Sequence, residues 1–223
     1  MSEPYYKDDL VTLYHGDCAD VLPTLGHVDL LLTDPPYGIA NIWTKGSEKH
    51  GWGKANLESA VRNEWDNSIP SVELLNIAIE LADNAVVWGG NYFELPPSRG
   101  WLVWNKPERG FSLAEAELAW TNKDMNIRVA DVHRSDSGRQ HPTQKPLSLM
   151  RWCIEKFPGT QTVLDPFAGS GTTLRAASDM GIASIGVERE EAYCELIAKR
   201  LSQQAFDFGS LEDEIRSSGW ANV

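Results

Sequence analysis

Short apolar runs alternate along this chain with longer stretches of helical spacing, and this alternation limits the fold more than any other feature. The runs are rich in β-branched residues and end at polar, Gly or Pro residues, which is typical of buried strands. We expect strands at Leu10–Tyr14, Val28–Thr33, Ala85–Trp88, Trp101–Trp104, Glu117–Trp120, Thr162–Asp165 and Ala183–Val187. We expect helices at Val72–Ala82, Pro146–Lys156, Thr172–Met180 and Glu190–Gln203. The pattern predicts an α/β domain with one doubly wound, mostly parallel sheet of about seven strands and helices on both faces.

The length and the apolar content suit a single domain. The 223 residues, 42% of them hydrophobic, are enough to bury one sizeable core. We place the domain at residues 1–204 and expect residues 205–223 to form a solvated acidic tail. Residues 38–67 and 121–140 show neither helical nor strand spacing. Because loops of this length in a compact domain are usually functional or disordered, both are candidates for contact with a ligand.

Charge, cysteine content and hydropathy exclude several classes of protein. The net charge of −12 argues against a protein that coats nucleic acid without specificity, since such binding depends on many Lys and Arg contacts to phosphates. Three separated cysteines without a CxxC pair argue against a disulfide framework and against a zinc site, so we expect no metal. No apolar run is long enough to span a bilayer, and the acidic N-terminal segment is unlike a secretory signal. We expect a cytoplasmic protein with no membrane partner, and the sequence leaves its oligomeric state open.

The segment Asp34-Pro35-Pro36-Tyr37, directly after the expected strand Val28–Thr33, is the most specific motif in the chain. Proline fixes φ and cannot continue a central strand, so the segment leaves the sheet as a stiff turn with exposed carbonyl oxygens. Such a turn suits an exocyclic amino group, because Asp34 and the Pro35 carbonyl can accept its N–H groups. Tyr37 can stack on the ring that carries the amine. A plain Pro-Pro turn is the structural alternative.

A second motif is the glycine-rich turn Ala168–Thr172, which follows an expected strand and opens an expected helix. Glycines let the backbone approach a ligand closely and leave the N–H groups of a helix N-terminus pointing at it. No Lys follows as in a P-loop, and Leu174 replaces the third glycine of the dinucleotide fingerprint. Asp165 would repel phosphates but suits an ammonium or sulfonium group, and Glu188 suits ribose hydroxyls or caps a helix. The motif favours a nucleoside-bearing cofactor without a diphosphate.

These residues resemble the family of S-adenosylmethionine-dependent DNA amino-methyltransferases, which modify adenine at N6 or cytosine at N4. The segments that carry the resemblance are Tyr14–Cys18, Leu32–Gly38, His141–Pro146 and Asp165–Gly171. Their order, with the catalytic motif before the cofactor loop, resembles the β-type permutation of the family. The resemblance implies a Rossmann-like methyltransferase domain, S-adenosylmethionine as cofactor, and DNA with a flipped-out base as partner.

The resemblance also implies a role for each matching residue. The catalytic residues that hold the target base would be Asp34, Pro35, Pro36 and Tyr37. The cofactor-binding residues would be Asp17, Thr143, Lys145, Asp165, Phe167, Gly169, Gly171 and Glu188. Lys145 would face the carboxylate of the cofactor, and Asp17 would face its adenine amino group. A surface lysine and a helix N-cap are the respective alternatives.

The candidate DNA contacts lie in two stretches where basic residues outnumber acidic ones. They are Lys45, Lys49, Lys54, Arg128, Arg134 and Arg139. The family commonly carries a larger recognition insertion where this chain has residues 121–140, so we expect a short recognition sequence or weak selectivity. Asp34 before Pro-Pro-Tyr resembles the adenine-specific branch, and adenine N6 is the expected target. Cytosine N4 methylation and catalytically silent DNA binding remain alternatives, and the resemblance suggests a restriction-modification or phage setting.

Overall fold

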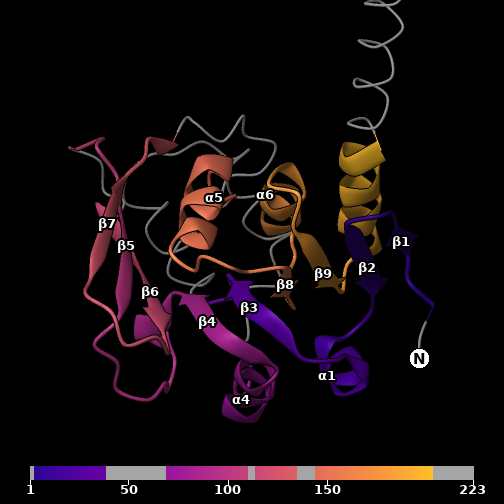
Figure 1. The fold of residues 1–223 in the computed structure, drawn as a ribbon, viewed down its shortest axis with the longest axis horizontal. Coiled ribbons are helices and arrows are strands. Elements are labelled where there is room, and N and C mark those ends of the chain that lie inside the picture. Colours follow the sequence, from indigo (N-terminus) through magenta and orange to yellow (C-terminus); the bar gives the residue numbers. More distant parts are fainter. Residues whose placement is uncertain (1–2, 39–68, 110–113, 135–143, 203–223) are drawn as a thin grey trace, which may run out of the picture.

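A computed structural model describes residues 3–38, 69–109, 114–134 and 144–202. Within these residues, nine strands form one sheet in the order β1-β2-β9-β8-β3-β4-β6-β5-β7 (Figure 1). The strands are β1 (Tyr6–Lys7), β2 (Val11–His15), β3 (Val28–Thr33), β4 (Ala82–Trp88), β5 (Trp101–Asn105), β6 (Ala116–Thr121), β7 (Arg128–Asp131), β8 (Thr162–Asp165) and β9 (Ala183–Glu188). Strands β2, β9, β8, β3 and β4 are parallel to their neighbours in this set, whereas β1 and β6 run antiparallel to theirs. The predicted mostly parallel α/β sheet is confirmed.

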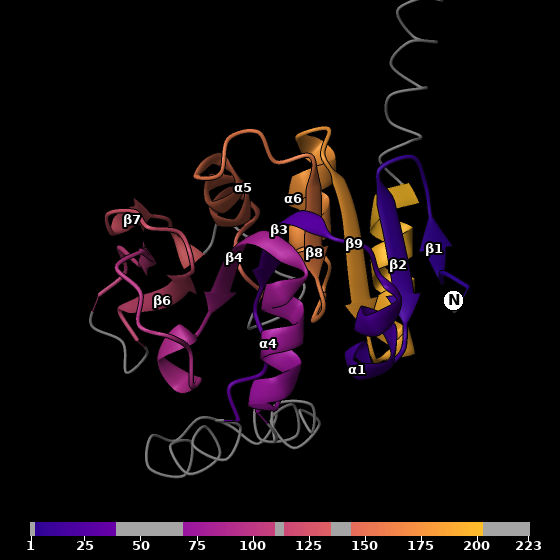
Figure 2. The same ribbon diagram turned by 60° about the horizontal axis from the view of Figure 1, so that its bottom comes forward.

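Helices cover both faces of this sheet. They are α1 (Cys18–Val21), α4 (Val72–Glu80), α5 (Leu147–Glu155), α6 (Thr172–Asp179) and a helical segment at 191–202, with short 3-10 turns at η1 (Leu22–Thr24) and η3 (Gly90–Tyr92). Helices α5 and α6 and the segment 191–202 lie on one face, and α1 and α4 lie on the other (Figure 1, Figure 2). No helix of the described ranges is long and apolar enough to cross a membrane.

The structure adds two strands to the seven expected. β1 has two residues, too few to give a periodic signal. β7 lies inside 121–140, where we expect a loop, and it pairs in parallel with β5. Ala130 is the single buried residue of β7, so its sequence shows no alternation of apolar and polar residues. The expected helix Val72–Ala82 was also too long. It ends at Glu80, and Ala82 already pairs with Val28 in the sheet.

The central strands are buried on both faces, which explains their continuous apolar runs. In β3, the side chains of Leu30 and Leu32 pack toward α5 and α6, whereas Leu31 belongs to the core under α4. The same alternation holds in β4, where Val86 and Val87 lie in different cores. Packing on both faces of the sheet fixes the carboxyl ends of its strands. The loops that follow these ends therefore start from fixed positions.

Candidate active site

The predicted site residues gather at the edge of the sheet where the parallel strands end. β2 leads into the loop of Asp17, β9 ends at Glu188, β8 ends at Asp165, and β3 leads into Asp34. These four strands are consecutive neighbours, in the order β2-β9-β8-β3. Segments far apart in the sequence therefore meet along one edge, which is the position where open α/β sheets bind ligands.

A hydrogen bond joins the two central motifs directly. Thr33 Oγ1 donates to Asp165 Oδ1 over 2.8 Å, and the Phe167 N–H donates to the same oxygen over 3.1 Å. Thr33 and Asp165 are both buried, so solvent does not compete for this bond. The corner after β3 and the glycine-rich turn after β8 are thus fixed side by side, and one ligand can contact both.

The corner after β3 presents the ring of Tyr37 on an aromatic platform. Tyr37 stacks on Tyr92 of η3, with ring centroids 5.0 Å apart and planes 18° from parallel, and meets the edge of Phe93. The ring also lies against Gly89, whose φ of +69° favours glycine and where an added Cβ would overlap the Tyr37 ring. These contacts fix the orientation of the ring. Its hydroxyl donates to Asp34 Oδ1, which ties the ring to the carboxylate.

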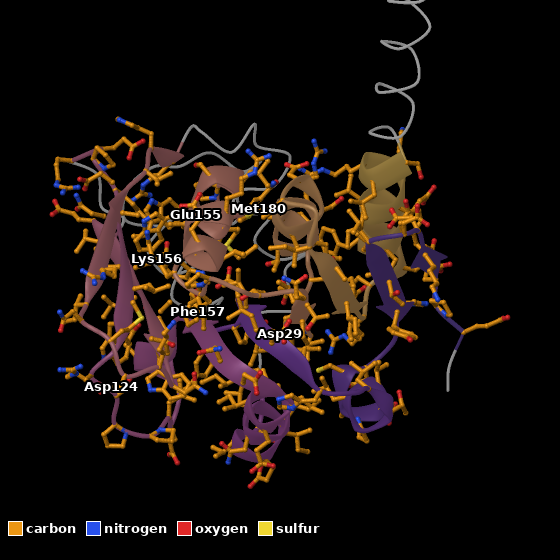
Figure 3. All side chains as sticks on the ribbon, in the orientation of Figure 1. Asp29, Asp124, Glu155, Lys156, Phe157 and Met180 are labelled. Carbon is orange, nitrogen blue, oxygen red and sulfur yellow. The ribbon has the colours of Figure 1, made fainter. Side chains whose placement is uncertain are left out.

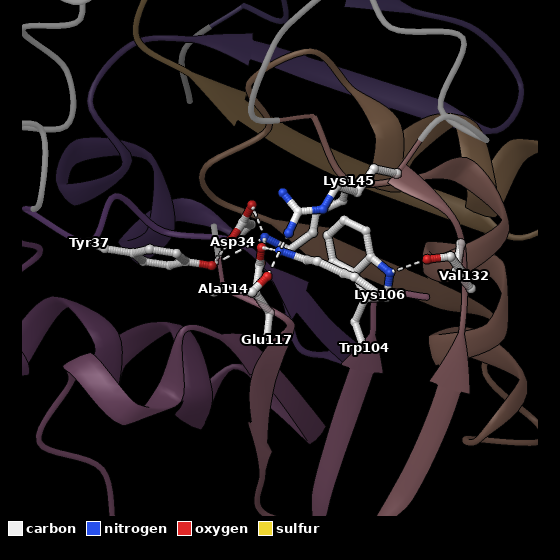
Figure 4. Close-up of polar contacts among 9 residues, drawn as sticks. Asp34, Tyr37, Trp104, Lys106, Ala114, Glu117, Val132 and Lys145 are labelled. Atoms are coloured by element: carbon white, nitrogen blue, oxygen red, sulfur yellow. Dashed lines mark hydrogen bonds and ion pairs between the residues drawn. The ribbon is translucent and has the colours of Figure 1, made fainter. Parts of the chain in front are cut away.

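A cluster of charges, with buried lysines and partly exposed carboxylates, forms around Asp34 (Figure 4). Lys145 Nζ lies 2.7 Å from Asp34 Oδ2, 3.0 Å from Glu117 Oε2 and 3.2 Å from the Tyr37 hydroxyl oxygen. These three contacts use all three N–H donors of the Lys145 ammonium. Glu117 Oε1 accepts a bond from Lys106 Nζ. The cluster thus contains two ammonium groups and two carboxylates. The side chains of both lysines are only 5% exposed.

The pKa values show how strongly these charges are coupled. Burial lowers the pKa of Lys145, but the charges of Asp34 and Glu117 outweigh burial and hold this pKa well above its usual value. Burial raises the pKa of Glu117, but the two lysines lower it to about 2. For Lys106 burial dominates and its pKa is lowered, although Glu117 partly offsets this effect. Burial and the Asp34 charge raise the pKa of Tyr37 well above its usual value, so this residue keeps its hydroxyl proton.

Several contacts fix the glycine-rich turn. The Ala168 N–H donates to the Val187 carbonyl over 2.9 Å, and the Gly169 N–H donates to Glu188 Oε2 over 2.8 Å. From the segment 191–202, Arg200 Nη1 donates to the Ser170 carbonyl over 2.7 Å. Ile197, from the same segment, contacts Gly171 so closely that a Cβ there would lie 2.7 Å from its Cγ1. The turn therefore has a defined shape before any ligand binds.

Glu188 and Asp17 act partly as the structural alternatives proposed for them. Glu188 Oε1 accepts from the Glu190 N–H over 2.8 Å, while Oε2 holds Gly169. Burial raises the pKa of Glu188. Asp17 caps α1, where its Oδ1 accepts from the Ala19 N–H over 2.9 Å. Each carboxylate oxygen has two lone pairs, so these bonds leave room for a ligand hydroxyl or amino group.

The residues at this edge fit a cationic nucleoside-type cofactor. Gly169 has a φ of +52°, and the nearest atom to an added Cβ is the Phe167 carbonyl oxygen at 3.9 Å, so its ligand-side face is open. Beside it lie the buried carboxylate of Asp165 and the carboxylate of Glu188. A sulfonium and an α-ammonium group would lie favourably near Asp165, and ribose hydroxyls near Glu188. Phe167 is partly buried and packs against the core under α4.

A hollow on the opposite edge of the sheet lies far from this chemistry. The first residues of β3 and β4 line it together with loop residues, and the lining residues are Asp29, Asp83, Asn84, Lys123, Phe157, Pro158, Gly159 and Thr160. Figure 3 labels Asp29 and Phe157. It contains none of the predicted site residues. The edge that carries Asp34 and Asp165 is therefore the candidate active site.

Comparisons with known proteins agree with this geometry. The family model described as DNA methylase, of the N6/N4 methyltransferase type, matches residues 87–200, slightly more than half of the chain. The chain belongs to this family of DNA methylases. Membership confirms the predicted class, an amino-methyltransferase that takes its methyl group from S-adenosylmethionine.

Individual relatives of this methylase cover most of its length. It is 24% identical to the type II methyltransferase M2.MboI of Moraxella bovis, over 89% of this chain and 90% of that one. It is 26% identical to the type II methyltransferase M.HinfI of Haemophilus influenzae, over 91% of this chain and 71% of that one. The fold is similar to that of the M1.HpyAVI complex with SAM, with a TM-score of 0.58 and 22% identity over 86% of this chain and 100% of that one. It is also similar to the cytosine-N4-specific PvuII methyltransferase, with a TM-score of 0.60 and 16% identity over 88% of each chain.

Of the six predicted DNA contacts, the structure describes Arg128 and Arg134. Arg128 is exposed on β7, and Arg134 donates to the Ala114 carbonyl over 2.6 Å, while its backbone N–H donates to Glu108. The remaining predictions fall outside the described residues, and these are Lys45, Lys49, Lys54, Arg139 and Thr143. Sequence reasoning missed Glu117 and Lys106. Glu117 opens the otherwise apolar run of an expected strand, but nothing local connects this acidic residue with Asp34.

Cofactor binding by the methylase is expected to depend on pH through Asp165. Burial raises the pKa of this carboxyl to about 6. Because the ionised form attracts a sulfonium, lowering the pH from about 7 to about 5 should weaken S-adenosylmethionine binding about tenfold. The stability that Asp165 contributes is present below its unfolded pKa and is lost as the pH rises through about 6. Protonation of Asp165 in acid therefore does not unfold the protein.

Calorimetric titration with S-adenosylmethionine across this pH range checks the prediction. The control is Asp165→Asn, which should bind weakly with little dependence on pH. An equally steep pH dependence in wild type and in Asp165→Asn would assign the titration to another group.

Proposed function

We propose that this methylase transfers a methyl group from S-adenosylmethionine to the N6 amino group of adenine in DNA. The proposal depends mainly on one observation, the hydrogen bond from Thr33 to Asp165 that holds the catalytic corner beside the glycine-rich turn. The choice of adenine is supported by Asp34 at the first position of the Asp-Pro-Pro-Tyr motif.

The residues of the corner would hold the target amine. The amino group lies inside the duplex, so the nucleotide must flip out, which costs a few kcal/mol. Stacking on Tyr37 returns about 1–3 kcal/mol, and the aromatic platform of Tyr92 keeps that ring in place. Asp34 and the Pro35 carbonyl accept the two N–H groups, which directs the nitrogen lone pair away from them. The lone pair would then point toward the neighbouring glycine-rich turn.

The residues of the turn would hold the methyl donor. S-adenosylmethionine supplies an electrophilic methyl group on a sulfonium. Gly169 and Gly171 would admit its methionine part close to the backbone, Asp165 would lie near its positive charge, and Glu188 would accept from its ribose hydroxyls. Thr143 and Asp17 complete the proposed set. Positioning of this kind would account for most of the acceleration of a direct displacement. No strong base is required at Asp34, because the amine becomes acidic once it is methylated and releases its proton to water.

Contacts to the DNA backbone would come from both loops and from β7. The proposed phosphate contacts are Lys45, Lys49, Lys54, Arg128, Arg134 and Arg139. Phosphate contacts place the enzyme on the duplex but carry no base sequence. Since residues 121–140 are few and partly form β7, a short recognition sequence or weak selectivity is proposed.

Nucleoside analysis tests the proposed function. Plasmid DNA is incubated with the protein and labelled S-adenosylmethionine, digested to nucleosides and analysed by mass spectrometry, and sequencing locates the modified bases. N6-methyladenine is the expected product. N4-methylcytosine alone would replace the adenine assignment, and DNA binding without any modified base would favour a silent DNA-binding protein.

A further inference from the structure

Lys145 already donates to the Asp34 carboxylate that a target amine would use. Its ammonium donates to Asp34 Oδ2 over 2.7 Å, and Tyr37 donates to the other oxygen. The Asp34 side chain is 28% exposed, whereas that of Lys145 is 5% exposed. The carboxylate therefore faces an approaching base on one side and an internal ammonium on the other. An internal ammonium and an external amine would therefore use the same carboxylate.

We propose that Lys145 competes with the target amine for Asp34, and that Glu117 accepts Lys145 when the amine binds. This inference rests on the proposed function, because it assigns roles within the same base site. In this scheme Lys145 and Glu117 are positioning residues, since both act through Asp34.

Glu117 is placed to accept the displaced ammonium. Its Oε2 is already 3.0 Å from Lys145 Nζ, so Lys145 can leave Asp34 without becoming an unpaired buried charge. Lys106 holds the other oxygen of Glu117 and orients its carboxylate toward Lys145. Lys106 is itself fixed, with Nζ 4.4 Å from the centroid of the Trp104 ring.

The exchange conserves charge and moves no proton. Two ammonium groups and two carboxylates are present before it and after it, and the incoming amine is neutral. One N–H···O bond from Lys145 to Asp34 is replaced by one from the amine. The strand geometry allows this arrangement, because β6 is antiparallel and brings its first residues, including Glu117, to the edge where β3 ends.

Two double variants distinguish competition between Lys145 and the target amine from a purely structural role of the charge cluster. Lys106→Met with Glu117→Gln leaves Lys145 facing Asp34 with no second carboxylate. Lys145→Met with Glu117→Gln removes the competitor and leaves Lys106. Each variant loses Glu117 and one lysine, and each keeps the net charge of the cluster at zero. They differ only in which lysine remains.

The expected result is a difference in KM for DNA, measured by steady-state methyl transfer with saturating S-adenosylmethionine. The variant that keeps Lys145 should raise this KM about tenfold, and the variant that lacks Lys145 should have a KM at or below that of wild type. The dissociation constant for S-adenosylmethionine should be unchanged in both, and calorimetry measures it. Thermal unfolding confirms that both variants fold.

Three outcomes would overturn the competition. Equal KM values for DNA in the two variants would show that Lys145 does not compete. Weaker S-adenosylmethionine binding only in the variant without Lys145 would place this lysine in the cofactor site instead. If the variants do not fold, Glu117→Gln alone must raise KM for DNA, and an unchanged value contradicts the role. A failure of the proposed function would appear earlier, as absence of methyl transfer by the wild-type protein.

Discussion

Asp34→Ala is expected to lower the rate of methyl transfer roughly 10²–10³-fold, the effect seen when one fixed polar contact to a reacting group is removed. Asp34 is the carboxylate of the catalytic corner, and without it the amine loses the acceptor that orients its lone pair. Binding of S-adenosylmethionine should survive, because Asp165 keeps its own bonds to Thr33 and Phe167. Lys145 keeps Glu117 as a partner, so the variant should fold. Transfer of labelled methyl to DNA and calorimetry with the cofactor measure the two properties.

Asp124→Ala is the matched control for this variant. Asp124 also pairs with a cation, Arg99, over 2.7 Å, but its side chain is 83% exposed and lies between β6 and β7, away from the candidate site (Figure 3). It should keep wild-type activity. Near-normal methyl transfer by Asp34→Ala would refute the assigned role of Asp34.

Gly169→Val is expected to block binding of S-adenosylmethionine, raising its dissociation constant at least about 100-fold, which corresponds to about 2.7 kcal/mol. The new side chain would meet no protein atom at its Cβ within 3.9 Å, so it would extend into the space proposed for the methionine part of the cofactor. The positive φ of +52° adds backbone strain of about 1–2 kcal/mol in a non-glycine residue. Calorimetry measures the loss of binding.

Gly181→Val is the control that separates backbone strain from blocking of the proposed cofactor site. Gly181 has a φ of +70°, and no atom lies within 4 Å of an added Cβ, but it precedes β9 at the opposite edge of the sheet. The two variants should lose similar stability on thermal unfolding. Only Gly169→Val should lose the cofactor, and equal binding by the two variants would count against the proposed cofactor site.

Much of the fold could be predicted because its signals are local. The runs of β3, β8 and β9 consist of buried and partly buried residues and contain few polar ones, so their positions follow from the apolar pattern. The motifs after β3 and β8 could be placed at one edge because parallel strands end on the same side. The strands at the sheet margins were harder, since β1 and β7 depend on pairing with a neighbour rather than on their own residues.

The charge cluster could not be predicted from local signals. Glu117 reaches the site because β6 runs antiparallel between β4 and β5, and this strand order is a long-range property. Lys106 follows β5, and its pairing with Glu117 depends on the register of that hairpin. For Lys145 the family resemblance pointed to the cofactor, whereas the structure shows its three donors on Asp34, Tyr37 and Glu117.

The contacts that fix the glycine-rich turn have a consequence for the order in which the protein folds during synthesis. Arg200 and Ile197, which fix Ser170 and Gly171, come late in the chain, and β9 must also be in place before Glu188 can bind Gly169. During synthesis on the ribosome, the catalytic corner at residues 34–37 emerges long before these contacts exist. The glycine-rich turn therefore reaches its final conformation late in synthesis. A nascent chain that ends before residue 200 contains the catalytic corner but cannot yet form the complete cofactor site.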